Sequence, residues 1–196
     1  MSDKVSIAAF LLAGGKSSRM GRDKGLINLA EKPMAKYAIE TLEKMGLTPT
    51  IVTNNEAYAS LGYPMIQDII PDKGPMGGLY TAMENTQATY VLLVSCDMPF
   101  VPKEAFQKLI EAAREQSVIV SEFMGKTNPL FALYHKSLKE QLKENLDLEK
   151  LKLLDFISET DFEKVDMEDL VLQSPKRFTN INTPEDLDNL NELWEN

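Results

Sequence analysis

The segment Leu12–Gly25 has the composition of a phosphate-binding turn. It follows a continuous apolar run, Ser6–Leu12, and its four glycines are interleaved with lysines and arginines. Glycine lets backbone N–H groups approach an anion because no Cβ stands in the way. Lys16, Arg19 and Lys24 would add formal positive charge around such a nest. The alternative is a plain glycine-rich turn with solvated lysines, but charge placed among glycines directly after a buried run favours an anion site.

The spacing of this segment matches neither of two common phosphate-binding motifs. A Walker A loop requires a glycine five residues before Gly15, and Phe10 stands there. The dinucleotide pattern G-x-G-x-x-G is also absent from this segment. The signal therefore indicates a phosphate ligand without fixing its class.

A carboxylate, Asp97, stands at the exit of a second apolar run, Tyr90–Ser95. Desolvating a carboxylate is costly unless something pairs with it. A divalent metal that bridges to phosphates is a natural partner, since Mg²⁺ prefers one or two carboxylates plus substrate oxygens. The alternative is an aspartate that caps the turn into a helix beginning at Pro102. The neighbouring Cys96 is expected to be a small buried side chain rather than a nucleophile.

Two further segments carry weaker signals. Asp68 lies just past a predicted strand and could accept a hydrogen bond from a base or a ribose hydroxyl, while Gly77-Gly78 at a predicted helix N-terminus would offer oriented N–H groups. Asn180 and Asn182 alternate on a predicted strand, so their side chains should point to the same side and could complete a magnesium shell or orient a phosphate. Simple loop, turn and cap roles remain open for both segments.

The elements that would position these residues alternate between strands and helices. The predicted strands are Ser6–Leu12, Thr50–Thr53, Met65–Ile66, Tyr90–Ser95, Ser117–Ser121 and Leu130–Tyr134. Helices are expected from Pro33 to Gly46, from Gly77, from Pro102, over Leu138–Ile157 in two pieces joined near Asn145, and after Thr183. Such alternation implies βαβ units. We therefore predict an α/β fold with three layers and a mostly parallel central sheet, in which ligands bind at the carboxyl ends of the strands.

The last predicted helix has a recognisable start. Thr183 is expected as its N-cap, Pro184 at its first position and Asp186 three residues after the cap, a carboxylate variant of the capping box. Leu187, Leu190 and Trp194 would form its buried stripe.

Composition excludes several classes of protein. The 196 residues fit a single domain, 1–196, and the net charge of −9 argues against a uniformly basic nucleic-acid binder. One cysteine rules out an internal disulfide, and one histidine, His135, rules out a two-histidine zinc site. We interpret His135 as structural or solvated. The longest apolar run, Val5–Ala13, is too short to cross a membrane, so a cytoplasmic protein without membrane contact is expected.

Taken together, four motifs resemble the molybdenum cofactor guanylyltransferases, the MobA family of nucleotidyltransferases with a Rossmann-like fold. The motifs are Leu12-Ala-Gly-Gly-Lys-x-x-Arg-Met-Gly-x-Asp-Lys24, Asp68 ahead of Gly74-Pro75-x-x-Gly78, Cys96-Asp97-x-Pro99, and Asn180-x-Asn182-Thr-Pro-Glu-Asp-Leu187. The resemblance runs from about Ile7 to Trp194. One departure concerns Asn128-Pro129, where family members often carry a His-Pro step, and it bears on the pterin end of the site.

The resemblance implies a role for each matching residue. The nucleotide, GTP, would contact the backbone of the first turn, the Lys24 ammonium and three polar side chains. This set is Leu12, Ala13, Gly14, Gly15, Lys24, Asn54, Asp68 and Asp97. Asp97 would hold Mg²⁺ beside the nucleotide, and Arg19 would face the phosphates. Arg19, Lys24 and Asp97 would thus serve catalysis. Asn180 and Asn182 would lie near the pterin or the metal.

The implied reaction is a transfer of GMP from GTP to the terminal phosphate of molybdopterin. That phosphate is already ionised at pH 7, so no general base is needed, and catalysis would rest on positioning and electrostatic stabilisation. Transient contact with cofactor-synthesis or molybdoenzyme partners is possible for such an enzyme. Two alternatives remain open: another nucleotidyltransferase, such as a cytidylyltransferase acting on a pterin or on a sugar or alditol phosphate, and a non-catalytic cofactor-binding or assembly module.

Overall fold

The computed structural model describes residues 5–14, 23–114, 116–183 and 185–186. Its strands are β1 Ile7–Leu12, β2 Asn28–Leu29, β3 Lys32–Pro33, β4 Thr50–Val52, β5 Met65–Ile66, β6 Tyr90–Ser95, β7 Val118–Phe123, β8 Lys126–His135 and β9 Phe162–Asp166. Its helices are α1 Met34–Glu43, α2 Gly74–Glu84, α3 Lys103–Glu111, α4 Lys139–Asp147, α5 Leu153–Ser158 and α6 Glu168–Gln173, with 3₁₀ turns at Lys24–Leu26, Glu56–Leu61, Lys136–Leu138 and Pro175–Phe178.

The two continuous apolar runs form the middle of the sheet. β1 and β6 pair in parallel from Ile7 opposite Tyr90 to Leu12 opposite Ser95. The seven-stranded sheet has the order β5-β4-β1-β6-β8-β7-β9. Within the described residues β8 runs antiparallel to both neighbours, and the other strands are parallel to one another. The expectation of a mostly parallel sheet is therefore confirmed.

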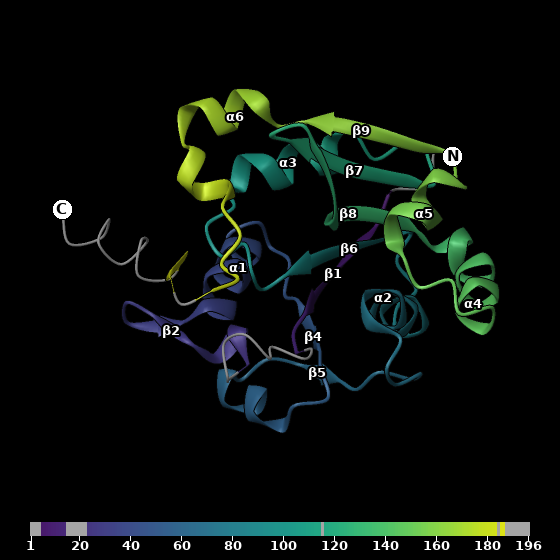
Figure 1. The fold of residues 1–196 in the computed structure, drawn as a ribbon, viewed down its shortest axis with the longest axis horizontal. Helices are drawn as coiled ribbons and strands as arrows, with labels where there is room; N and C mark the ends of the chain where they lie inside the picture. The colour runs from purple at the N-terminus through teal and green to yellow at the C-terminus, as the bar shows by residue number, and fades with distance from the viewer. Residues whose placement is uncertain (1–4, 15–22, 115, 184, 187–196) are drawn as a thin grey trace.

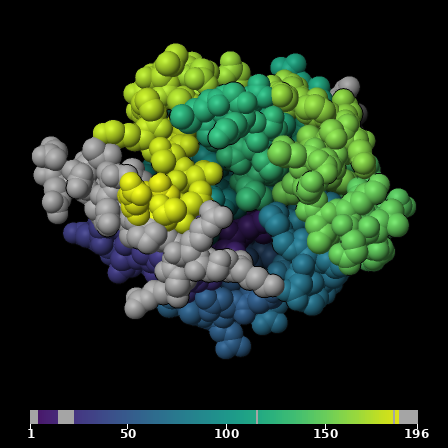
Figure 2. Space-filling model, in the orientation of Figure 1, coloured from purple at the N-terminus to yellow at the C-terminus, as the bar shows by residue number. Residues whose placement is uncertain are grey.

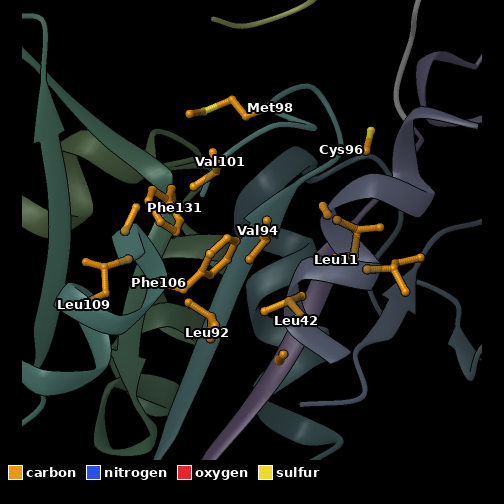
Figure 3. Close-up of a cluster of buried hydrophobic side chains, with 14 of the residues drawn as sticks. Leu11, Leu42, Leu92, Val94, Cys96, Met98, Val101, Phe106, Leu109 and Phe131 are labelled. Atoms are coloured by element: carbon orange, nitrogen blue, oxygen red, sulfur yellow. The ribbon is translucent and has the colours of Figure 1, made fainter. Parts of the chain in front are cut away.

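Helices cover both faces of the sheet, which makes three layers (Figure 1). One buried cluster joins the sheet to α1, α3 and α6, and a second joins the opposite face to α2, α4 and α5. In the first cluster the rings of Phe106 and Phe131 meet edge to face at 4.9 Å beside Val94, while Cys96 and Met98 lie toward the end of the strand (Figure 3). The hydrophobic core thus extends up to the edge where the polar residues begin.

Two predicted helices have different bounds in the structure, each for a local reason. α2 begins at Gly74 rather than Gly77, with Pro75 in its first turn, where a missing N–H costs nothing. The break between α4 and α5 covers 148–152 instead of Asn145, because Glu149 adopts a left-handed conformation and Lys150 N–H closes the helix onto the Asn145 carbonyl. A left-handed glutamate gives no sequence signal comparable to a glycine.

The predicted strand through 180–182 does not form. Its backbone makes one long-range bond, from Ile181 N–H to the Asp97 carbonyl at 2.8 Å, and Ile181 is fully buried. The predicted capping box is confirmed, because the Asp186 carboxylate accepts from Thr183 N–H at 2.8 Å and Thr183 Oγ1 accepts from Asp186 N–H. Pro184, Leu187, Leu190 and Trp194 lie outside the described residues. Among the described helices, none combines the length and the apolar character that crossing a bilayer requires.

Candidate active site

A cleft opens where the parallel strands end. The carboxyl ends of β1, β4 and β6 lie at the same edge of the sheet because the three strands are parallel and adjacent. The cleft has a volume of about 1120 Å³, large enough for a nucleotide together with part of a second substrate. Figure 2 shows the N-terminal segment at the bottom of a hollow beside the blue and teal segments. Its lining includes Leu12, Ala13, Gly14, Asp23, Lys24, Thr53, Asn54, Asn55, Asp68, Asp72, Gly74, Pro75, Gly78, Ser95, Cys96, Asp97 and Leu130.

The turn after β1 is shaped by Gly14. Its φ of +98° lies in the region that side chains with a Cβ rarely adopt, and a Cβ there would stand 3.2 Å from Thr53 Oγ1. The residue before it, Ala13, donates its N–H to the Val52 carbonyl at 3.0 Å, which ties the turn to β4. Gly14 is exposed at the cleft. The first part of the predicted phosphate-binding turn therefore faces the cavity, whereas Gly15 and Arg19 lie outside the described residues.

Gly78 brings α2 against the end of β1. A Cβ added at Gly78 would lie 2.7 Å from Leu12 Cδ2 and 3.3 Å from Leu12 Cδ1. Helix α2 can approach the strand this closely only without that atom. Gly77 donates its N–H to the carbonyl of Lys73, the N-cap residue, and Gly78 is the fifth residue of the helix, so the prediction of oriented N–H groups at a helix N-terminus is wrong for both glycines.

We expect Gly78→Ala to weaken GTP binding by displacing Leu12 and the turn that follows it. The dissociation constant should rise by about tenfold or more, given that overpacking of this kind typically costs 1–3 kcal/mol. Gly46→Ala is the control for the effect of a glycine-to-alanine change on stability alone. Gly46 has no heavy atom within 4 Å of an added Cβ and is strained only by its positive φ. Calorimetric titration of both variants measures the effect. Equal GTP affinity in the Gly78 variant and the unsubstituted chain would contradict this role of the close approach.

Lys24 lines the cleft and bonds to a distant segment of the chain. It is the first residue of a short 3₁₀ turn, and its ammonium donates to Asn182 Oδ1, which lies 158 positions later in the chain. Asn182 is itself held by its backbone, because its N–H donates to the Asp186 carboxylate at 2.8 Å. That bond is the first cause of the lowered pKa of Asp186. The structure therefore brings Asn182 to Lys24, but neither Asn182 nor the exposed Asn180 belongs to the cleft lining.

Asp97 lies in the same cleft as Lys24. Its backbone is fixed on both sides: Asp97 N–H donates to Ser95 Oγ at 3.4 Å, and its carbonyl accepts from Ile181 N–H at 2.8 Å. Its carboxylate makes no hydrogen bond or ion pair with any described residue. Pro102, not Asp97, stands at the start of α3, and no side chain caps that helix. The carboxylate therefore remains available to a ligand.

The candidate metal ligands of the cleft are carboxylates, and Asp23, Asp68, Asp72 and Asp97 line it. Within the described residues no three His, Cys, Asp or Glu side chains converge as a metal-binding group. This arrangement suits Mg²⁺, which commonly keeps water and substrate phosphate oxygens as most of its ligands and takes one or two carboxylates from the protein. It does not suit a cation that needs a complete protein cage.

Asn54 and Asp68, which follow β4 and β5, exchange two hydrogen bonds in the cleft lining. Asn54 Nδ2 donates to Asp68 Oδ2 at 3.0 Å, and Asp68 N–H donates to Asn54 Oδ1 at 3.0 Å. Burial raises the pKa of the Asp68 carboxyl, while the Asn54 hydrogen bond opposes that shift. One carboxylate oxygen thus remains as an acceptor for a hydroxyl or amino group of a ligand.

Several cleft residues escaped the sequence analysis. Asp23, Asn55 and Asp72 line the cavity, and the buried Tyr58 donates its hydroxyl to Asp23. Two of them carry a sequence signal: Asp23 belongs to the motif that ends at Lys24, and Asp72 lies in the turn-forming sequence Pro71-Asp-Lys-Gly74 and has a φ of +61°. Asp23 and Tyr58 are 35 positions apart, and nothing in their spacing announces the contact.

The cysteine and the histidine behave as predicted. Cys96 is buried at the floor of the cleft, and burial raises the pKa of its thiol to about 12, so it is a poor nucleophile. His135 Nδ1 accepts from Ser137 N–H, and its ring packs against Tyr90 at the opposite end of β6. Neither side chain is available for acid–base chemistry in the cleft.

Asn128-Pro129 lies beside the cleft rather than in it. The register of β7 and β8 shifts between Val120 and Ser121, and Pro129 falls in the irregular stretch of β8, where its missing N–H is tolerated. Asn128 contacts the Met98 sulfur at 3.1 Å. Leu130, which follows, is the residue of this segment that lines the cavity.

Comparisons with known proteins agree with this geometry. The model of the MobA-like NTP transferase domain matches residues 9–162. A probable molybdenum cofactor guanylyltransferase of Flavobacterium johnsoniae is 33% identical over 95% of this chain and 97% of its own length, and a molybdenum cofactor guanylyltransferase of Vibrio parahaemolyticus is 33% identical over 93% and 94%. The crystal structure of molybdopterin-guanine dinucleotide biosynthesis protein A from Archaeoglobus fulgidus superposes with a TM-score of 0.79 at 24% identity, covering 96% of this chain and 98% of that one. A strand-end cleft lined by a glycine turn, a lysine and an aspartate, on a chain matched over this length, places the protein in the MobA-like NTP transferase family.

Proposed function

We propose that this protein transfers GMP from GTP to the terminal phosphate of molybdopterin. Family membership and the names of its relatives support guanylyl transfer. The observation that carries the proposal is that Gly14, Lys24 and Asp97 line one continuous cavity. A triphosphate is stabilised by oriented N–H groups, a fixed cation and a metal-binding carboxylate, and these three residues would supply them.

We assign the nucleotide to the β1 side of the cleft. The backbone of Leu12, Ala13 and Gly14 would contact GTP, and the Lys24 ammonium would exchange its bond to Asn182 for a phosphate oxygen. The Asn54–Asp68 pair would accept from the ribose or the base. Gly15 and Arg19 complete the proposed set; both belong to the same glycine-rich segment and are assigned on the family motif alone.

Mg²⁺ is the metal proposed for Asp97. When bound, it would offset the negative charge of the triphosphate and fix its orientation. Asp97 supplies the protein ligand, and its fixed backbone presents the carboxylate to the cleft at a constant position. The remaining ligands would be phosphate oxygens and water.

Molybdopterin would enter from the side of Asn180 and Asn182. In the reaction, an oxygen of its terminal phosphate forms a bond to the α-phosphorus of GTP while the bond from that phosphorus to the bridging oxygen of the β-phosphate breaks. Pyrophosphate leaves, and no proton must be removed from the nucleophile. Lys24 and the N–H groups of the turn stabilise the negative charge that spreads over the phosphates.

GTP is expected to raise the melting temperature of the protein far more than CTP. At a hundredfold excess over the dissociation constant, the bound state gains about 2.7 kcal/mol, which corresponds to a shift of roughly 5–10 °C for a domain of this size. Thermal-shift measurements in the presence of Mg²⁺ test this. A larger shift with CTP would favour a cytidylyltransferase instead.

The reaction itself is tested with GTP labelled at the α-phosphate. Incubation with Mg²⁺ and molybdopterin should move the label into a pterin dinucleotide and release unlabelled pyrophosphate in equal amount. Tight GTP binding without transfer would instead favour the second candidate, a cofactor-binding or assembly module.

A further inference from the structure

The Asp23 carboxylate connects the 3₁₀ turn at Lys24–Leu26 to residues that follow β4. Oδ1 accepts from the Tyr58 hydroxyl and from Gly25 N–H at 3.3 Å, and Oδ2 accepts from Asn55 Nδ2 at 3.1 Å. Asn55 is itself fixed, because its N–H donates to Thr53 Oγ1 and its Oδ1 accepts from Ala57 N–H. Asp23, the residue before Lys24, therefore ties the 3₁₀ turn to the loop that follows β4.

The Tyr58 hydroxyl lies directly against the backbone of Gly25. Tyr58 is fully buried and does not line the cleft. A Cβ at Gly25 would stand 2.2 Å from the Tyr58 oxygen, so the tyrosine reaches the backbone of the 3₁₀ turn only because residue 25 is glycine. Burial raises the pKa of Tyr58, so the hydroxyl stays protonated and donates.

The charge distribution around Asp23 points to a role in positioning. Its carboxylate lines the cleft with Lys24 and Asp97, yet no described lysine or arginine forms an ion pair with it. Its oxygens are satisfied by three neutral donors instead. The Lys24 ammonium is thus left to Asn182 and to an incoming anion rather than neutralised by its own neighbour.

We propose that Tyr58 is a positioning residue for phosphate binding: its hydroxyl holds the Asp23 carboxylate, and Asp23 holds the 3₁₀ turn that presents Lys24 to the cleft. This inference rests on the proposed function and extends it to a residue that never touches the substrate. Removal of the hydroxyl leaves Asp23 Oδ1 with only the long bond from Gly25 N–H, so the carboxylate is held less firmly and can turn toward the ammonium of the adjacent Lys24. Lys24 is then paired with Asp23, and its ammonium binds phosphate less well.

The test is a double-mutant cycle between Tyr58→Phe and Lys24→Ala. Tyr58→Phe should raise the dissociation constant for GTP and lower kcat/KM, each by about tenfold, as expected for the loss of a hydrogen bond to a charged group. In the Lys24→Ala background the same change should alter the two constants by less than twofold, because the group through which it acts is gone.

Tyr90→Phe is the matched control. Tyr90 is also fully buried, and its hydroxyl donates to the Gln116 carbonyl at 2.7 Å, away from the cleft. It should lower the melting temperature about as much as Tyr58→Phe without changing GTP affinity. Gly25→Ala provides a second route, since its methyl displaces the Tyr58 hydroxyl while Tyr58 itself is retained, and it should reproduce the defect of Tyr58→Phe.

Each result decides between alternatives. A defect that is as large in the Lys24→Ala background as in the unsubstituted chain would show a general structural effect and overturn the inference. So would unchanged GTP affinity in both Tyr58→Phe and Gly25→Ala. Failure of the proposed function is distinct: the unsubstituted protein would then transfer no GMP, whereas the inference alone fails when that protein is active and the Tyr58 variant matches it.

Discussion

Asp97→Ala is expected to lower kcat for GMP transfer by about 10²-fold or more while the fold remains intact. Losses of this size are typical when one stabilising group is removed from a charged transition state. The Asp97 side chain makes no bond with any described residue, so its removal should leave the melting temperature of the ligand-free protein nearly unchanged. Steady-state kinetics at saturating GTP and Mg²⁺, together with a melting curve, measure both quantities.

Asp155→Ala is a suitable control for this variant, because Asp155 is exposed on α5 and does not line the cleft. It should retain full turnover. The Asp97 variant should also lose the stimulation by Mg²⁺ at millimolar concentration. Turnover close to that of the unsubstituted protein, with an unchanged dependence on Mg²⁺, would contradict the role of Asp97 in holding the metal.

Lys24→Ala is the second change with a large expected effect. The ammonium is the described cation in the cleft lining, and its loss should raise the dissociation constant for GTP by about tenfold or more. The variant also removes the bond to Asn182, so the effect on kcat should exceed the effect on affinity when molybdopterin is the acceptor. Titration calorimetry with GTP and kinetics with both substrates separate the two contributions.

Lys126→Ala serves as the matched control, since Lys126 is an exposed lysine on β8 outside the cleft. Lys24→Arg keeps the charge but changes its geometry and should recover only part of the affinity, because a planar guanidinium does not replace a compact ammonium. An unchanged GTP dissociation constant in Lys24→Ala would remove Lys24 from the site.

The sheet and the position of the site could be predicted because they depend on local pattern. Apolar runs at Ser6–Leu12 and Tyr90–Ser95 can be placed only in the middle of a parallel sheet, and polar residues that follow such strands must meet at one edge. The structure brings Gly14, Lys24 and Asp97 to one cavity as that reasoning requires. Their individual contacts with substrate remain predictions.

Elements with a weak apolar pattern could not be predicted in the same way. β9 alternates exposed and half-buried residues at the edge of the sheet, and its sequence, Phe-Glu-Lys-Val-Asp, resembles a solvated loop. It pairs with β7, where the ion pair between Lys164 and Glu122 joins the two strands. The segment is a strand because it pairs with β7, and its own sequence does not indicate that pairing.

Contacts between distant residues were equally inaccessible. The bond from Tyr58 to Asp23 and the bond from Lys24 to Asn182 depend on how separate loops meet after folding. The residue types of Asn180 and Asn182 mark their motif, but its pattern predicts a strand that does not form. Asn182 is instead held by the hydrogen bond from its N–H to the Asp186 carboxylate, at the start of the last predicted helix. Residue types indicate which groups could act in the cleft, and only tertiary structure shows which of them meet.

The central claim is that one triphosphate lies between the turn at Gly14, the Lys24 ammonium and the Asp97 carboxylate. A crystal structure of the protein with GTP and Mg²⁺, in the absence of a pterin acceptor, tests it most directly. We expect the phosphates against the N–H groups after β1, the Lys24 ammonium on a phosphate oxygen, and the metal bound by Asp97 and by phosphate oxygens. GTP bound elsewhere on the molecule, or bound in this cleft with its triphosphate turned away from Lys24 and Asp97, would contradict the account.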